Sequence, residues 1–121
     1  MTVLALDHVQ IAAPSGCEDD ARGFFGDLLG LRELPKPETL AARGGVWFAC
    51  GRQELHVGVE EAFAPARKAH PAFAVGDLDA LRERLARADV AVRDDESIPG
   101  LRRFYADDPF GNRLEFVEAA A

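Results

Sequence analysis

The stretch DPFGNRLEF, residues 108–116, predicts how the chain ends. Asp, Pro, Gly and Asn, which favour tight turns, fill most of its first half. The second half alternates polar and apolar residues, and such alternation is typical of a strand with one buried face. We therefore predict a turn followed by a final strand over residues 113–118, with Leu114 and Phe116 on one face and Glu115 on the other.

The residues before this turn predict one helix among several strands. Residues 70–76 (HPAFAVG) favour a strand, and Asp77 can cap a helix that follows it. That helix has an apolar stripe formed by Leu78, Leu81, Leu85 and Ala88. Two further strands are expected before the final one, so the second half has the order strand, helix, three strands. The expected ranges of these two strands are 90–94 and 101–106.

The first half of the chain predicts the same order. A strand over residues 4–13 ends at Pro14, and a capping-box pattern from Ser15 to Glu18 predicts a helix that stops near Gly30. A short strand, a loop and two strands follow, over residues 31–35, 36–45, 46–50 and 53–60. With residues 61–69 as a connector, we predict one α+β domain over residues 1–121, built from paired βαβββ modules at about 3–60 and 70–118.

Composition limits the classes of protein to which the chain can belong. It has 121 residues, 48% of them hydrophobic, and a formal net charge of −7, which disfavours a nucleic-acid partner. Its amino end lacks the basic start of a signal peptide, and no stretch reaches the length of a membrane span. Cys17 and Cys50 are isolated, which favours free thiols in a reducing cytoplasm. We therefore expect a cytoplasmic protein without a membrane partner.

Four side chains occupy matching places in the two predicted halves. His8 lies on the first strand of one half and His70 on the first strand of the other. His56 and Glu115 lie on the two last strands, so the separations within the halves are similar, at 48 and 45 residues. Side chains alternate between the two faces of a strand. His56 and Glu115 therefore each lie on the face opposite to that of their apolar neighbours. Each half therefore offers two potential ligands at equivalent positions.

Imidazole and carboxylate groups suit divalent Fe, Mn, Ni, Co or Zn. Three histidines and one glutamate leave a coordination position open when the ion takes more than four ligands. Taken one at a time, His8, His56 and His70 have an ordinary structural interpretation, and Glu115 an ordinary solvent-facing one. Their matched placement favours a metal site, with the identity of the ion open.

Three segments carry a resemblance to a known family. They are Asp7–Ala12 (DHVQIA), Phe24–Leu31 (FFGDLLGL) and the stretch 108–116. With them the chain resembles the vicinal oxygen chelate superfamily, also called the glyoxalase/bleomycin-resistance/dioxygenase family. The resemblance implies a mixed, rolled sheet whose concave face holds a metal.

The same resemblance implies a ligand set and an assembly. The ligands would come from the first and last strands of each module: His8, His56, His70 and Glu115. It also implies a homodimer, in which the first two ligands meet the last two of the partner chain. Pairing within one chain is the alternative that other family members use.

One departure from the family bears on the reaction. Glyoxalases of this superfamily usually have a glutamate where this chain has His56, which argues against standard glyoxalase chemistry. The resemblance favours a metal-dependent lyase, isomerase or epimerase acting on a small oxygenated compound. An Fe(II) extradiol-type dioxygenase and a metal-free protein that binds a drug or toxin are the alternatives.

Further residues are candidates for substrate chemistry. Glu54 shares a strand face with His56 and could move a proton, although an exposed glutamate has an equally simple structural explanation. Trp47 is a candidate wall of the substrate site, and Arg103 with Tyr105 could orient an anionic substrate. The competing interpretations are core packing for the two aromatic residues and surface charge for the arginine.

Overall fold

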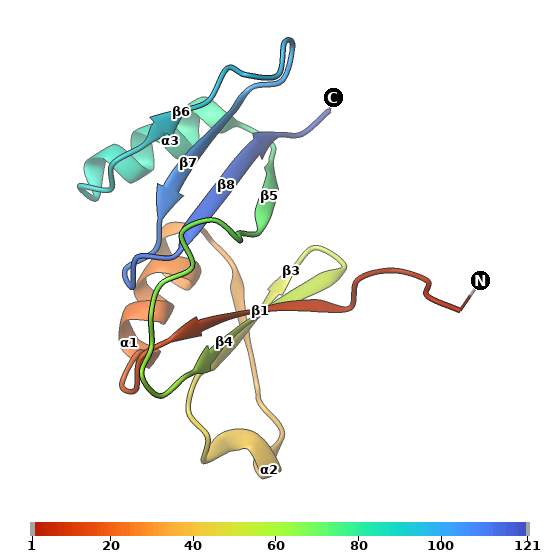
Figure 1. The fold of residues 1–121 in the computed structure, drawn as a ribbon, viewed down its shortest axis with the longest axis vertical. Coiled ribbons are helices and arrows are strands. Elements are labelled where there is room, and N and C mark those ends of the chain that lie inside the picture. The colour runs from red at the N-terminus through yellow and green to blue at the C-terminus, as the bar shows by residue number, and fades with distance from the viewer. Residues whose placement is uncertain (1, 121) are drawn as a thin grey trace. The chain divides into compact units, whose positions relative to one another are not determined.

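The computed structural model describes residues 2–120 and divides into two compact units, residues 1–64 and 65–121. Figure 1 shows a sheet of similar construction in each unit. Each unit contains four strands in the order strand, helical segment, three strands, and the first unit adds a short helix at Glu38–Ala41 between its second and third strands. The predicted α+β fold of paired βαβββ modules is therefore confirmed. Whether the two units act as a single domain stays a prediction.

The first unit has a mixed sheet in the order β1-β4-β3-β2. Strands β1 and β4 run parallel, and the other two pairs are antiparallel. The apolar face of this sheet meets the helical segment η1, whose Phe25 lies 5.9 Å, ring to ring, from Phe48 of β3. In chain order the elements are β1 (His8–Ala13), α1 (Glu18–Ala21), η1 (Arg22–Leu28), β2 (Arg32–Leu34), α2 (Glu38–Ala41), β3 (Val46–Cys50) and β4 (Gln53–Val59).

The second unit repeats this topology with the order β5-β8-β7-β6. Strands β5 and β8 run parallel, and the remaining pairs are antiparallel. Helix α3 buries Leu78 and Leu85, and the sheet buries Phe104 and Phe116, whose rings lie 5.4 Å apart. The elements are β5 (Ala72–Val75), α3 (Leu78–Arg87), β6 (Arg93–Asp94), β7 (Arg103–Asp107) and β8 (Arg113–Glu118).

Several local predictions hold in detail. The Asp77 carboxylate accepts a hydrogen bond from the Ala80 amide at 3.0 Å and caps α3. Asp108 organises the turn before β8 by accepting the amide hydrogens of Phe110 and Asn112, each at 2.9 Å. Gly111 has φ +92°, a conformation that glycine adopts without strain. The turn chemistry of residues 108–112 is thus confirmed.

Other boundaries differ from the sequence predictions. Strand β1 begins at His8 rather than residue 4, because its pairing with β4 starts there, and Leu4 and Leu6 are 88% and 70% exposed. The predicted loop 36–45 contains the short helix α2. Strand β5 begins at Ala72, so His70 lies two residues before it. None of the described helices is long and apolar enough to cross a membrane.

The predicted capping box at the first helix is wrong. Cys17 is the N-cap residue of α1, and its side chain makes no capping hydrogen bond. The Glu18 carboxylate instead accepts a hydrogen bond from the Gly45 amide at 2.6 Å, which joins the helix to the start of β3. That hydrogen bond is the main reason why the pKa of Glu18 lies below its ordinary value. A contact between residues this far apart in sequence has no local signature.

Candidate metal centre

The second unit brings His70 and Glu115 into direct contact. The Nε2 atom of His70 lies 2.9 Å from Oε1 of Glu115, and both side chains are largely buried. Two ligand atoms that bind one ion at right angles, each about 2.1 Å away, are about 3.0 Å apart. The observed separation therefore suits two adjacent ligands of one divalent ion.

The other nitrogen of His70 determines what can lie between these two atoms. Nδ1 is 2.7 Å from the carbonyl oxygen of Lys68. A carbonyl oxygen only accepts hydrogen bonds, so Nδ1 must donate, as metal-binding histidines usually do to an outer partner. Nε2 then faces a carboxylate, which also accepts. A proton or a metal ion has to occupy the contact between Nε2 and Oε1.

Arg103 holds the second oxygen of the Glu115 carboxylate. Its Nη1 atom donates to Oε2 of Glu115 at 3.2 Å and to the Tyr105 hydroxyl at 3.3 Å. Nη2 donates to Ser97 Oγ at 3.0 Å and approaches Asp95 at 3.3 Å, which fixes the guanidinium group. Glu115 thus directs one oxygen toward His70 and the other toward Arg103.

The environment of Glu115 favours its ionised form. Burial would raise the pKa of this carboxyl, but hydrogen bonds from His70 and Arg103 outweigh burial, and the pKa lies below its ordinary value. The Arg103 side chain is only 12% exposed, which excludes the interpretation of a solvated surface charge. Its Nε atom is buried without a hydrogen-bond partner among the described residues. Tyr105 completes the cluster with its ring 5.4 Å from that of His70, edge to face.

The first unit brings His8 and His56 together as a stack. The two rings lie 4.2 Å apart with an interplanar angle of 17°. On its other side, His56 stacks on Trp47 at 3.9 Å and 4°. Trp47 is therefore part of the same cluster. His56 is 5% exposed between these two rings, so its orientation is strongly restrained.

Carboxylates accept hydrogen bonds from both imidazoles of this stack. His8 Nδ1 lies 2.9 Å from Asp7, and His56 Nε2 lies 2.9 Å from Oε1 of Glu54. Because a carboxylate only accepts, these two nitrogens donate, and the opposite nitrogen of each ring is the one that could offer a lone pair to an ion. Glu54, the candidate proton carrier, is here the partner that orients His56.

The two donor pairs differ in their fit to an ion. The lone pairs of His8 and His56 lie in nearly parallel ring planes, so they do not converge on one point about 2.1 Å from each nitrogen. One ring must turn before both can bind the same ion. The His8 side chain is 45% exposed and has room to do so. Within residues 2–120, no group of three His, Cys, Asp or Glu side chains has the geometry of a metal site.

Strand register nevertheless shows that the two pairs are equivalent. Gln10, two residues after His8, is the β-sheet partner of His56. Ala72, two residues after His70, is the β-sheet partner of Glu115. Each pair therefore occupies the same place relative to a parallel strand pair, although His70 itself precedes β5.

Comparisons with known proteins give the family. A model of the glyoxalase/bleomycin resistance protein/dioxygenase superfamily matches residues 5–116. The chain belongs to this superfamily. It is 51% identical to a Bacillus anthracis protein provisionally assigned to the glyoxalase family, over 99% of this chain and 98% of that one, with a TM-score of 0.95. A search of the curated proteins found no match.

More distant solved structures share the superfamily fold. Lactoylglutathione lyase from Agrobacterium tumefaciens is 24% identical over 98% of this chain and 96% of its own, with a TM-score of 0.76. A mutant of the fosfomycin resistance protein FosX from Listeria monocytogenes, determined with Mn(II) and a dihydroxypropylphosphonic acid, is 14% identical over 98% and 95%, with a TM-score of 0.82. At these identities the likeness shows the fold alone.

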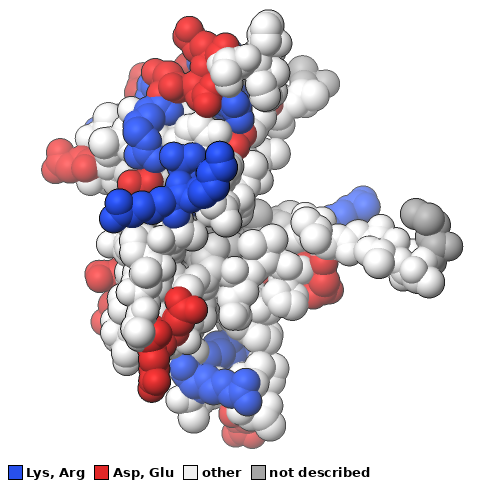
Figure 2. All heavy atoms as spheres, in the orientation of Figure 1, with Lys and Arg blue, Asp and Glu red and all other residues white. Residues whose placement is uncertain are grey.

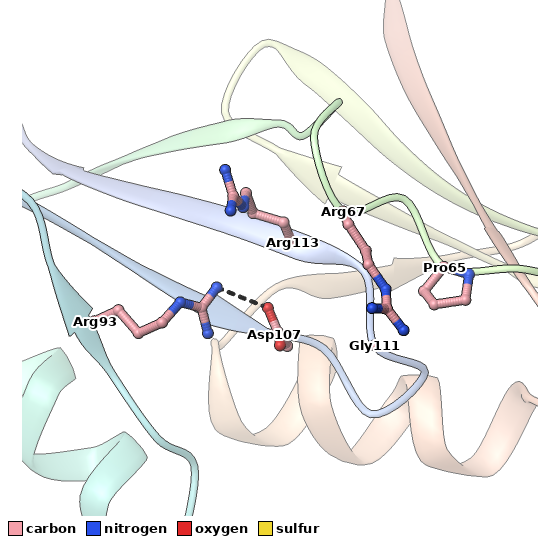
Figure 3. Close-up of a pocket in the computed structure, with 6 residues that line it drawn as sticks. All are labelled: Pro65, Arg67, Arg93, Asp107, Gly111 and Arg113. Carbon is pink, nitrogen blue, oxygen red and sulfur yellow. Dashed lines mark hydrogen bonds and ion pairs between the residues drawn. The ribbon is translucent and has the colours of Figure 1, made fainter.

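Sequence reasoning did not single out three arginines of the second unit. Arg67, Arg93 and Arg113 line one cavity of the second unit, together with Asp107 (Figure 3). Strand parity places Arg113 on the same face as Glu115, and this was the one available signal. Arg67 lies in the connector and Arg93 on a two-residue strand, where no periodic pattern gives the direction of a side chain.

Proposed function

We propose that this superfamily member is a metal-dependent lyase, isomerase or epimerase that acts on a small oxygenated compound. The observation that supports this most directly is the contact between His70 and Glu115. The ring nitrogens of His70 lie 2.7 Å from the Lys68 carbonyl oxygen and 2.9 Å from the Glu115 carboxylate. A divalent ion could replace a proton in the contact with Glu115. FosX, a relative in fold, was determined with Mn(II).

The proposal assigns His70 and Glu115 as one donor pair and His8 and His56 as the other. A divalent ion, when bound, would polarise the oxygens of the substrate as a Lewis acid. Arg103 donates a hydrogen bond to one carboxylate oxygen of Glu115, so that only the other oxygen is available to the ion. Glu54 and Asp7 hold the donating nitrogens of the stacked imidazoles and leave the opposite nitrogens available.

Glu54 is proposed as the proton carrier of the reaction. Its side chain is 42% exposed, so a substrate can reach the carboxylate, and its contact with His56 keeps it on the polar face of β4. Tyr105 and Arg103 are proposed to orient the substrate, because both border Glu115 in the second unit. Trp47 is proposed as the apolar wall beside His56.

Metal content provides the test of the ligand assignment. We expect the gently purified protein to contain a stoichiometric divalent ion, and His56→Ala, His70→Gln and Glu115→Gln each to lower its metal content at least tenfold. Glu118→Gln is the matched control, because it lies on the same strand, pairs with Arg102 and should keep the metal. Far-UV circular dichroism confirms that each variant is folded. Unchanged metal in His56→Ala and Glu115→Gln would refute the site.

Metal identity and reaction type then separate the enzyme classes. Ni, Co, Zn or Mn that supports proton exchange on a vicinal oxygen compound fits the proposal. Tight Fe(II) with oxygen consumption would instead indicate a dioxygenase. A metal-free native protein that binds a drug stoichiometrically would indicate a binding protein. Light scattering tests the predicted homodimer separately.

A further inference from the structure

Three arginines surround a cavity at one end of the β7–β8 pair. The cavity has a volume of about 450 Å³ and lies entirely in the second unit. In Figure 3, Arg67, Arg93 and Arg113 approach it from three different segments, with Asp107 and the turn at Gly111 between them. Figure 2 shows Lys and Arg gathered on one face of this unit. Such a concentration is notable in a chain whose net charge is −7.

Two hydrogen bonds of Ala66 bring the arginine-bearing segments together. The Ala66 amide donates to the side-chain oxygen of Asn112 at 2.9 Å, and the Arg113 amide donates to the Ala66 carbonyl at 2.8 Å. These two hydrogen bonds fix the connector, with Arg67, beside the start of β8. Arg113 is also the sheet partner of Asp107. The position of the cavity wall is therefore set by the fold.

The positive charge of the three arginines is not neutralised by the carboxylates that line the cavity. Asp107 is the one carboxylate that lines it, and it pairs with Arg93 at 3.0 Å. Arg113 lies over the ring of Tyr105, 5.0 Å from its centre, and no carboxylate pairs with Arg113 or Arg67 among the described residues. Two positive charges are thus left over. Arginine presents a planar fork of N–H donors that matches carboxylate and phosphate oxygens.

We propose that this cavity binds a dianionic oxyanion group of the substrate, either a phosphate or a pair of carboxylates. Arg67 and Arg113 would supply the two unpaired charges. Arg113 lies two residues before Glu115 on the same face of β8, which places their backbones about 6.6 Å apart. The inference rests on the proposed function where it assigns the anion to the substrate, and a substrate of this class would have its reacting oxygens near Glu115.

Anion binding can be measured without the metal. The full-length chain, treated with EDTA, is titrated at low ionic strength with inorganic phosphate and, separately, with malonate, while NMR follows the Nε–Hε signals of its arginines. We expect saturable shifts for Arg67 and Arg113. Arg67→Gln and Arg113→Gln should each weaken the tighter-binding anion at least fivefold. The matched control is Arg52→Gln, which removes the same charge from an exposed site in the first unit and should change affinity less than twofold.

Comparing phosphate with malonate shows which kind of anionic group the cavity prefers. Tighter binding of phosphate assigns a phosphate or phosphonate group, and tighter binding of malonate assigns a dicarboxylate. Equal weakening by all three substitutions, or shifts spread over every arginine, would show charge screening and overturn the proposal. Loss of metal binding with anion binding intact would refute the proposed function and leave the cavity assignment standing.

Discussion

Gly45 provides the sharpest test of how the first unit is held together. Its φ of +89° lies outside the conformations that other residues adopt readily, and it stands at the entry to β3. A Cβ atom built there would fall well inside contact distance of the Val57 carbonyl oxygen. That oxygen belongs to β4, which holds His56. Gly45→Ala should therefore disturb the β3–β4 pairing itself.

The expected loss follows from two contributions. Backbone strain at positive φ costs about 1–2 kcal/mol for a residue with a side chain. The clash is with backbone, which cannot rotate away, and overpacking of this kind costs about 1–3 kcal/mol. Gly45→Ala should thus lower the free energy of unfolding by about 2–5 kcal/mol. Gly51 is the matched control, because its φ is +59° and nothing lies within 4 Å of its Cβ position.

Urea unfolding followed by far-UV circular dichroism measures both variants. Gly51→Ala should lose only the strain contribution, about 1–2 kcal/mol. A loss in Gly45→Ala no larger than that in Gly51→Ala would show that the close approach to Val57 does not restrict the fold. An unchanged denaturant slope in both variants would confirm that the comparison concerns the native state.

Three further predictions concern stability. Glu18→Gln should cost about 1–2 kcal/mol at pH 7, because a charged acceptor is lost from the Gly45 amide. The lowered pKa of Glu18 stabilises the fold above the ordinary glutamate range, so this difference should shrink in urea melts at pH 4 and vanish at lower pH. Asp77→Ala should cost about 1 kcal/mol by removing the cap of α3, whereas Asp77→Asn, which keeps a capping oxygen and removes the charge, should cost little. Leu85→Ala should cost about 2–5 kcal/mol in the same assay, and a loss below 1 kcal/mol would contradict its full burial.

Sequence patterns were most informative where structure is local. Strands β3 and β8 have the predicted bounds, because a turn signal limits each of them. An apolar run fills β3, and alternating polarity fills β8. The cap at Asp77 follows from one side chain and the amide three residues later. The prediction of where β1 begins was wrong for the opposite reason. Leu4 and Leu6 are apolar, but only a partner strand could make them part of a sheet.

The donor pairs illustrate the same limit. Matching positions in two modules were enough to associate His8 with His56 and His70 with Glu115. Ring orientation was not predictable, because the stacking of His56 depends on Trp47 from a neighbouring strand. The arginine cavity could not be predicted from the sequence, because its lining residues come from separate segments. The strand register of β7 and β8 and the hydrogen-bonded connector bring these segments together.

The stack on His56 also gives the protein an intrinsic optical probe. Trp47 is the only tryptophan in the sequence, and its indole lies face to face with the imidazole of His56, which is proposed as a ligand. Indole emission is sensitive to its immediate surroundings, so any event that turns or occupies that imidazole should alter the fluorescence of the unlabelled protein. Binding of an ion at the proposed pair of His8 and His56 should therefore be visible in real time without a chromophoric substrate.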